Sequence, residues 1–419
     1  MNSSFKYKDG EFHIGGVSVA TIAEAVGTPC YIYSYEFLVD SFTAYNEAFA
    51  DRDTLICYSV KANSNLAILK AFSDLGSGYD IVSGGELLRV KRAGGDPGKV
   101  VFSGVGKTRE EMKAAIEAGI LFFNVESEEE LHVLNSVGIE IGKKAPVALR
   151  VNPDIDPKTH PYISTGFKKS KFGIEIGRAF KVYKEAQKME GIDVIAIDAH
   201  IGSQIFDLTP FVDSVRKLIG LADDLVAEGI NIQYIDIGGG LGISYKLDDK
   251  PPHPKMYADI IMKEFSGKPY KLVLEPGRSL MGNAGMLVTK VLYLKEGTAK
   301  KFVIVDAAMN DLIRPAFYES YHEILPVTEN SSGKEVVDVV GPICESGDFL
   351  AQDRELPQVK SGDLLAVLSA GAYGFVMSSN YNTRPRVAEV LVKGDQFSII
   401  RQRETYDELL GLEQIPDFL

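Results

Sequence analysis

Lys61 is the position around which the chemistry-bearing residues of this chain are organised. It follows the short apolar run 55–58, so the sequence places an amine at the end of an expected strand. In apolar surroundings the charged ammonium is disfavoured, and the neutral amine is then available to form a Schiff base with a carbonyl compound. The alternative is a solvated surface lysine, which is the commonest state of this residue type. The residue types at the ends of the other apolar runs decide between the two interpretations.

Other apolar runs also end in residues whose side chains or backbone could take part in binding or catalysis. These are Asp80, Arg150, His200, the run Gly238-Gly239-Gly240 and the tetrapeptide Glu275-Pro276-Gly277-Arg278. Three residues without Cβ let backbone N–H groups approach an anion closely, so the glycine run predicts a phosphate cradle, with a plain tight turn as its alternative. His200 has the alternative of a satisfied core histidine.

A lysine and a phosphate cradle in one site point to pyridoxal 5′-phosphate, a phosphorylated aldehyde that needs both. Glu275 then has a role as well, because a carboxylate beside the pyridine nitrogen keeps that nitrogen protonated and the ring strongly electron-withdrawing. This setting favours decarboxylation, whereas a racemase is better served by a less electron-poor ring. The residues therefore predict a pyridoxal-phosphate site of the decarboxylase kind.

The elements that must position these residues alternate regularly. Helix-period segments separate most of the apolar runs, and Thr108 with Glu111, and Ser127 with Glu130, form capping-box patterns at two helix starts. A further helix-like segment spans 65–75. The apolar runs lie at 55–60, 78–83, 100–104, 121–125, 147–151, 194–201, 232–237 and 272–275. Eight strands alternating with helices predict an α/β fold with a (β/α)₈ TIM-like barrel over residues 36–285, and no G-x-G-x-x-G supports a dinucleotide-binding fold.

The remaining residues have a different pattern of apolar and polar residues. Segments such as 286–293 and 302–305 are β-rich with few long helices between them, which predicts a mostly-β domain over 286–419. Residues 11–35 are expected to form short strands and turns, with a hairpin at Gly15-Gly16, and residues 1–35 to join that domain. The segment 160–166 is predicted as a mobile loop, with a static connection as its alternative.

Composition narrows the class of protein. The 419 residues are 45% hydrophobic and 25% charged, as in ordinary globular enzymes, and the net charge of −13 argues against binding to nucleic acid or to an anionic membrane surface. The three cysteines have no metal-ligand spacing and no disulfide framework, so no metal site is expected. Without an apolar signal core, and with reduced cysteines, a cytoplasmic protein is predicted.

An ordered series of motifs resembles the diaminopimelate decarboxylases, which belong to the barrel-type pyridoxal-phosphate decarboxylases related in fold to alanine racemase. The resemblance extends over nearly the whole chain. The motifs are Tyr58-Ser59-Val60-Lys61-Ala62-Asn63, Ser83-Gly84-Gly85-Glu86-Leu87, Arg150-Val151-Asn152-Pro153, His200-Ile201-Gly202-Ser203-Gln204, Gly238-Gly239-Gly240, Glu275-Pro276-Gly277-Arg278-Ser279, Met309-Asn310-Asp311-Leu312-Ile313-Arg314-Pro315 and Cys344-Glu345-Ser346-Gly347-Asp348.

The resemblance implies a role for each matching residue. Lys61 carries the cofactor, His200 stacks on its ring and Glu275 pairs with the pyridine nitrogen. Cys344 supplies a proton, reaching the site from the partner subunit of a homodimer. The implied cofactor-binding set is completed by Asp80, Ser203, Gly239, Gly240, Gly277, Arg278 and Tyr373, and the implied substrate-binding set is Arg278, Arg314, Tyr318, Glu345 and Tyr373.

The substrate set also has a physical interpretation. A substrate whose far end is a zwitterion needs a cation for its carboxylate and an anion for its amine, and Arg314 with Glu345 supplies both signs. This favours decarboxylation of meso-2,6-diaminopimelate to L-lysine and carbon dioxide. For Arg314 a surface salt bridge is the alternative, and for Cys344 a small buried hydrophobe, although its loop is rich in turn residues.

Two other functions stay open at this point. One is a related decarboxylase acting on carboxynorspermidine, arginine, ornithine or a D-amino acid, and Arg314 and Tyr318 disfavour it. The other is a non-catalytic pyridoxal-phosphate-binding protein, which has no need of the β-rich domain or of Cys344-Glu345. Asp80 and Arg150 are expected to orient the site through hydrogen bonds, and Cys30 and Cys57 to lie in the core.

Overall fold

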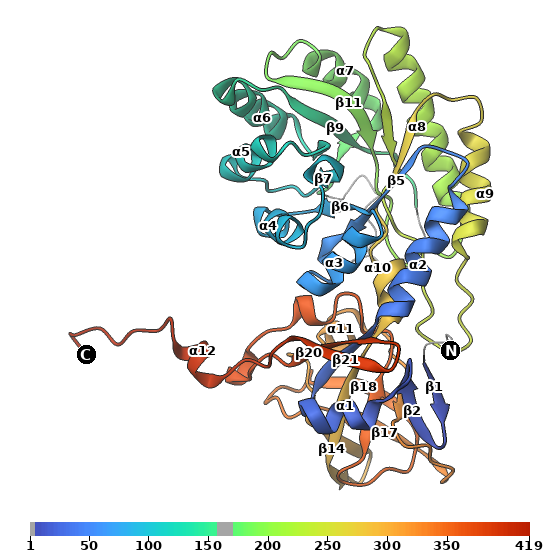
Figure 1. Ribbon diagram of the computed structural model, residues 1–419, viewed down its shortest axis with the longest axis vertical. Helices are drawn as coiled ribbons and strands as arrows, with labels where there is room; N and C mark the ends of the chain where they lie inside the picture. The colour runs from blue at the N-terminus through green and yellow to red at the C-terminus, as the bar shows by residue number, and fades with distance from the viewer. Residues whose placement is uncertain (1–4, 157–170) are drawn as a thin grey trace. The chain divides into compact units, whose positions relative to one another are not determined.

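The computed structural model describes residues 5–156 and 171–419 (Figure 1). Its chain divides into two compact units. One contains residues 39–243 and 250–280, and the other contains residues 1–38, 244–249 and 281–419. The segment 160–166, predicted as a loop, lies outside the described residues. Among the helices of the described residues, none is long and apolar enough to cross a membrane.

The first unit is a closed barrel of eight parallel strands, as predicted. Neighbouring strands pair in chain order, and β13 closes the barrel on β5 with Leu272 opposite Thr54. A two-residue strand, β10 (Ile174–Glu175), pairs with β9 outside the ring. The barrel strands are β5 (Thr54–Ser59), β6 (Gly78–Ile81), β7 (Val100–Phe102), β8 (Phe122–Val125), β9 (Ala145–Asn152), β11 (Ile192–Asp198), β12 (Tyr234–Asp236) and β13 (Lys271–Leu274). Each overlaps one of the eight predicted runs, because strands buried on both faces are continuously apolar.

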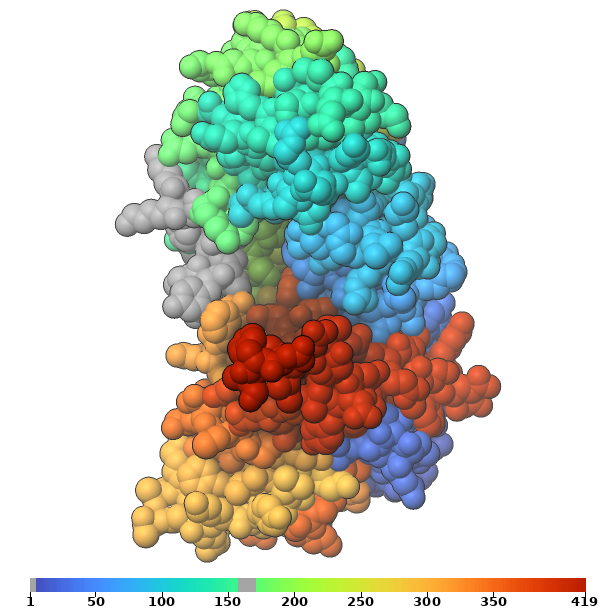
Figure 2. Space-filling model, turned by 90° about the vertical axis from the view of Figure 1, so that its left-hand side faces the viewer, coloured from blue at the N-terminus to red at the C-terminus, as the bar shows by residue number. Residues whose placement is uncertain are grey.

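Helix α2 precedes the first barrel strand, the other helices follow strands of the barrel, and together they cover its outside. They are α2 (Tyr35–Ala48), α3 (Leu66–Asp74), α4 (Gly84–Arg92), α5 (Arg109–Ala118), α6 (Glu128–Ile141), α7 (Ile176–Ala186), α8 (Thr209–Ala227), α9 (Pro254–Glu264) and the short α10 (Arg278–Met281). Consecutive helices from α3 to α6 contact one another, and Figure 2 shows their outer surface in blue and cyan.

The helix starts follow the predicted caps, with one difference. Thr108 and Glu111 form the full capping box at α5. At α6, Ser127 caps the helix, but the carboxylate of Glu130 accepts from the N–H of Glu126 and pairs with Lys107. The carboxylate of Glu130 therefore pairs with the buried Lys107 and does not accept from the N–H of Ser127, which is the bond that the capping-box pattern predicts.

The second unit is mostly β, as predicted. Its main sheet runs β18-β17-β15-β14-β4-β20-β21, with β19 pairing to β14 and β16 to β19. The N-terminal strand β4 lies inside this sheet, between β14 and β20, which confirms that N-terminal residues join the domain. The strands are β4 (Cys30–Ser34), β14 (Gly285–Glu296), β15 (Lys301–Val305), β16 (Ile324–Pro326), β17 (Lys334–Val340), β18 (Phe349–Pro357), β19 (Leu364–Val367), β20 (Ala388–Lys393) and β21 (Gln396–Arg401). Beyond β14, the helices α11 (Arg314–Tyr318) and α12 (Tyr406–Leu410) have five residues each.

The prediction for residues 11–35 was wrong in part. Strands β1 (Phe5–Lys8), β2 (Glu11–Ile14) and β3 (Val17–Ser18) form a small antiparallel sheet with the hairpin at Gly15-Gly16. Residues 19–26, however, form the helix α1 (Val19–Val26). Val19, Ile22 and Ala23 are buried from one helical face, and this 3–4 spacing was the signal that the strand interpretation overlooked.

Candidate active site

Lys61 stands on a single 3₁₀ turn, η1 (Val60–Ala62), directly after β5. Its Nζ lies 2.5 Å from Oδ2 of Asp80, a fully buried carboxylate at the end of β6, and 37% of its side chain is exposed. The expectation of apolar surroundings was therefore wrong, because the lysine lies beside a buried anion. Ser59 Oγ donates to the same Asp80 oxygen at 2.8 Å and to the carbonyl of Glu275 at 2.9 Å, which ties together the ends of β5, β6 and β13.

Glu275 follows β13 and is held by two polar residues, Ser103 after β7 and Asn124 on β8, from strands that do not pair with β13. Its Oε1 accepts from Asn124 Nδ2 at 3.1 Å and from Ser103 Oγ at 3.4 Å. Asn124 also donates to Ser103 Oγ at 3.0 Å, so the three side chains form one buried network. Burial, followed by the nearby charge of Asp80, raises the pKa of Glu275 to about 7.

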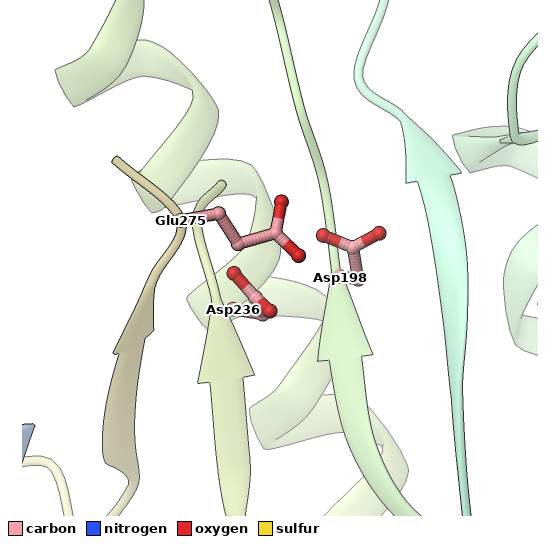
Figure 3. A group of neighbouring side chains, drawn as sticks. All are labelled: Asp198, Asp236 and Glu275. Atoms are coloured by element: carbon pink, nitrogen blue, oxygen red, sulfur yellow. The ribbon is translucent and has the colours of Figure 1, made fainter. Parts of the chain in front are cut away.

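Three buried carboxyl groups meet inside the barrel, as Figure 3 shows for Asp198, Asp236 and Glu275. One oxygen atom from each lies within 4.8 Å of the others. Burial and the charge of Glu275 raise the pKa of Asp198 and of Asp236 well above the ordinary value. Like charges at this separation disfavour joint ionisation, so protons are retained here at pH values where exposed carboxyl groups have lost them.

His200 is an uncharged ring fixed by the glycine run. Burial, together with the positive charges of Arg150 and Lys61, lowers its pKa well below the ordinary value. The N–H of Gly239 donates to His200 Nδ1 at 3.2 Å, so this nitrogen is the unprotonated one. A Cβ on Gly239 would lie 2.3 Å from the carbonyl oxygen of Glu275, and one on Gly240 2.5 Å from that of Gly202. The glycines thus let the loops after β11, β12 and β13 pack backbone against backbone.

Two more predicted residues contact each other at the same end of the barrel. Arg278 Nε donates to Ser203 Oγ at 3.1 Å, and Arg278 is buried. Arg150, at the end of β9, forms a buried ion pair with Glu126 at 2.8 Å. The barrel therefore gathers its predicted residues at the carboxyl ends of its strands, where the active sites of such barrels lie.

The barrel residues fit pyridoxal phosphate by their chemistry. An amine, an uncharged aromatic ring, a buried carboxyl group, a hydroxyl and an arginine are what its aldehyde, ring, pyridine nitrogen and phosphate require. Among the described residues, Asp80 Oδ1 is buried without a hydrogen-bond partner, and the N–H of Gly240 donates to no acceptor. The N–H groups of Gly238 and Gly239 are already used by Asp236 and His200, so only part of the glycine run is available to an anion.

The raised pKa of Glu275 predicts a pH-dependent cost to the cofactor-free protein. Between its ordinary value of 4.5 and about 7, the folded state binds more protons at this carboxyl group than the unfolded state, so stability falls as pH rises through that window. Glu275→Gln should therefore stabilise the apoprotein at pH 8 by about 1–3 kcal/mol, and much less at pH 5. Urea unfolding at both pH values measures this, with exposed Glu117→Gln as the control. An equal effect at the two pH values contradicts the prediction.

In the second unit, Arg314 is the first residue of α11 and is 5% exposed. A surface salt bridge was therefore the wrong alternative. Its Nη1 lies 3.1 Å from His322 Nε2, its Nη2 donates to Ser320 Oγ at 3.2 Å, and its guanidinium lies 4.9 Å from the ring centre of Tyr245. Tyr318 is half-buried at the end of the same helix.

Cys344 and Glu345 are exposed on the loop between β17 and β18. Asp348 shapes this loop, because its carboxylate accepts from the N–H groups of Met309 and Ile343, both at 2.7 Å. The N–H of Cys344 donates to Asn382 Oδ1 at 3.0 Å. Cys344 is thus no core residue, whereas Cys30 and Cys57 are fully buried as expected.

Tyr373 lies after β19 with a left-handed backbone, φ 56°. A non-glycine residue in this region costs free energy that the surrounding structure must offset. The nearby Gly371 has no room for a Cβ, which would lie 2.0 Å from the carbonyl oxygen of Met281. The turn that presents Tyr373 is therefore tightly constrained within this unit.

Several residues of the barrel network were missed from the sequence. Like the predicted ones, they are polar residues at the ends of apolar strands, so extending the same search to single polar residues would have found them. They are Ser59, Ser103, Asn124, Glu126, Asp198 and Asp236.

Known proteins are similar to this chain over almost its full length. The model of the pyridoxal binding domain of pyridoxal-dependent decarboxylases matches residues 36–282. A diaminopimelate decarboxylase of Aquifex aeolicus is 53% identical over 409 residues, which cover 98% of this chain and 97% of the relative. The structure of diaminopimelate decarboxylase from M. jannaschii with L-lysine has a TM-score of 0.95 and 43% identity, covering 100% of this chain and 99% of that chain. The corresponding Helicobacter pylori structure with L-lysine has a TM-score of 0.91 and 41% identity, covering 94% and 98%.

The barrel, its lysine and the matched domain together define a pyridoxal-phosphate-dependent decarboxylase, a carboxy-lyase. The matches extend through the β-rich unit, beyond the residues 36–282 that the model of the pyridoxal binding domain matches. The chain belongs to the diaminopimelate decarboxylase family.

Proposed function

We propose that this enzyme removes one carboxylate of meso-2,6-diaminopimelate and releases carbon dioxide and L-lysine. The observation that carries the proposal is the 53% identity over 98% of the chain. The general decarboxylase domain ends at residue 282, whereas Arg314, Tyr318, Cys344 and Glu345 all follow it. The similarity extends over the part of the chain that contains these residues, and this supports a shared substrate as well as a shared cofactor.

Pyridoxal phosphate, when bound, accepts the electron pair that remains on the substrate carbon after carbon dioxide departs. The barrel residues hold it. Lys61 would hold its aldehyde group, Glu275 would pair with the pyridine nitrogen, and the uncharged ring of His200 would offer an aromatic face. The phosphate-binding groups would be those of Ser203, Gly240, Gly277 and Arg278, together with Tyr373 of the β-rich unit. Gly239 was predicted among them, but its N–H is already donated to His200, so it would contribute only close backbone packing. Asp80, next to Lys61 Nζ at 2.5 Å, orients the amine.

The β-rich unit selects the substrate in this proposal. A far end that carries both an amine and a carboxylate needs partners of both signs, and Arg314 and Arg278 take the carboxylate while Glu345 takes the amine. Tyr318 and Tyr373 complete the contacts. A substrate with only an amine at its far end leaves the buried Arg314 without an anion, at a cost of about 3–5 kcal/mol.

Cys344 supplies the proton that replaces the lost carboxylate. Its side chain is exposed on a loop whose conformation Asp348 fixes. This supports a role in contact with another subunit rather than in the core of its own chain. We propose that it acts in the site of a partner subunit, so that the enzyme is a homodimer with shared active sites. Three free cysteines suit a reducing compartment, and we place the enzyme in the cytoplasm.

A substrate panel tests the function. Carbon dioxide release is measured with pyridoxal phosphate present and with diaminopimelate, ornithine, arginine, carboxynorspermidine or a D-amino acid such as D-lysine as substrate. We expect release from diaminopimelate, with kcat/KM for each other compound lower by about 10² or more, because each lacks the second zwitterionic end or places it differently. A faster reaction with any other member assigns the enzyme to that substrate instead.

A further inference from the structure

His322 is a fully buried histidine of the β-rich unit with no role among the residues predicted from the sequence. It lies between α11 and β16. Glu319 ends α11 in a left-handed conformation, φ 53°, and the N–H of Ser320 donates to the carbonyl oxygen of Arg314 at 3.3 Å. This turn brings the chain back, so that Ser320 and His322 both reach the guanidinium of Arg314.

The two ring nitrogens of His322 have different partners. Nδ1 lies 2.8 Å from the carbonyl oxygen of Leu368, and Nε2 lies 3.1 Å from Nη1 of Arg314. A carbonyl oxygen only accepts, so Nδ1 carries the hydrogen. A guanidinium nitrogen only donates, so Nε2 presents its lone pair. The contacts therefore define one tautomer of a neutral imidazole.

The sheet holds His322 in this position. Leu368 directly follows β19, and β19 pairs with β16, where Val367 lies opposite Ile324. The rings of Tyr245 and His322 pack nearly at right angles with ring centres 5.3 Å apart, and the guanidinium of Arg314 lies over the Tyr245 ring. The imidazole and the guanidinium thus share one rigid setting.

The three neighbours of Arg314 described above, His322, Ser320 and Tyr245, are uncharged. They orient the guanidinium without themselves adding a negative charge beside it. A carboxylate at position 322 would instead form a paired interaction with the guanidinium and occupy the donors that an incoming anion needs. A neutral acceptor with a fixed tautomer orients an arginine without itself forming an ion pair with it.

We propose that His322 is a positioning residue that determines substrate specificity by fixing Arg314 for the carboxylate at the far end of the substrate. The inference rests on the proposed function, in which Arg314 takes that carboxylate. His322 acts through Arg314 and touches neither substrate nor cofactor.

Two inhibitors separate this role from a general effect on folding. L-Lysine keeps the far-end amine and carboxylate, whereas cadaverine has the same chain and amines without the carboxylate. The holoenzymes to compare are wild type, His322→Gln, His322→Leu, Arg314→Gln and, as a control, exposed His132→Gln on α6. Inhibition constants and the KM for diaminopimelate are measured for each.

In His322→Leu we expect KM for diaminopimelate and the inhibition constant of L-lysine to rise about tenfold to a hundredfold, the loss of a hydrogen bond to a charged group. Inhibition by cadaverine should not change. His322→Gln keeps a donor and an acceptor and should recover part of the loss, and it carries the test if the leucine variant does not fold. His132→Gln should match wild type.

Two results overturn the inference in different ways. If Arg314→Gln weakens L-lysine but neither His322 variant does, or if they weaken cadaverine equally, His322 has no positioning role. If wild type does not decarboxylate diaminopimelate, the proposed function is wrong. If Arg314→Gln leaves L-lysine inhibition unchanged, the proposed role of Arg314 is wrong. The inference about His322 fails in either case.

Discussion

Lys61→Ala should lose nearly all decarboxylation of diaminopimelate, by a factor on the order of 10³ or more, or about 4 kcal/mol of transition-state stabilisation. The reason is chemical. Alanine has no amine to bind the aldehyde of pyridoxal phosphate, and the deletion also leaves the fully buried carboxylate of Asp80 without its cationic partner at 2.5 Å. Turnover and the visible absorbance of the bound cofactor are the measurements.

Covalent labelling makes the test specific to this lysine. Borohydride reduction of the wild-type holoenzyme should attach the cofactor to the peptide that contains Lys61, detected by mass spectrometry, and the variant should show no label there. The control is Lys70→Ala, an exposed lysine on α3 that also pairs with an aspartate, Asp74. Retained turnover in Lys61→Ala, or a label on another lysine, would show that Lys61 does not carry the cofactor.

The barrel was predictable because its signals are local. A strand buried on both faces must be apolar along its length, and the polar residue that ends it then stands out, as Lys61, Asp80, His200 and Glu275 do. The helix starts at Thr108 and Ser127 were equally visible. Periodicity fails where an element is short, which is why α1 was mistaken for strand and turn.

The surroundings of the site residues were less predictable, because they depend on pairs far apart in sequence. Nothing local to Lys61 shows that its neighbour is a buried carboxylate from the next strand. The network of Asn124 and Ser103 on Glu275 spans three strands, and the contact of His322 with Arg314 depends on a turn at Glu319. The sequence predicts which polar groups follow apolar strands. Which of those groups contact one another depends on how the whole chain folds.

Cys344→Ala should lower kcat by a factor of about 10²–10⁴, the usual contribution of a positioned acid. Alanine cannot donate the proton that replaces the departed carboxylate, and because the thiol is exposed its removal should cost little stability. The matched control is Ser346→Ala, an exposed residue of the same loop. A wild-type kcat in Cys344→Ala shows that another group supplies the proton.

Mixing two inactive variants tests whether the site is shared between subunits. In a dimer of one Lys61→Ala chain and one Cys344→Ala chain, a shared site that pairs the intact Lys61 of one chain with the intact Cys344 of the other is complete, and the second site lacks both. Random exchange makes half of the dimers mixed, so roughly a quarter of wild-type activity should return. If each site instead uses both residues of one chain, every site in the mixture lacks one of them. Activity that stays at the level of the separate variants, in dimers verified as mixed by mass spectrometry, therefore rules out the shared site.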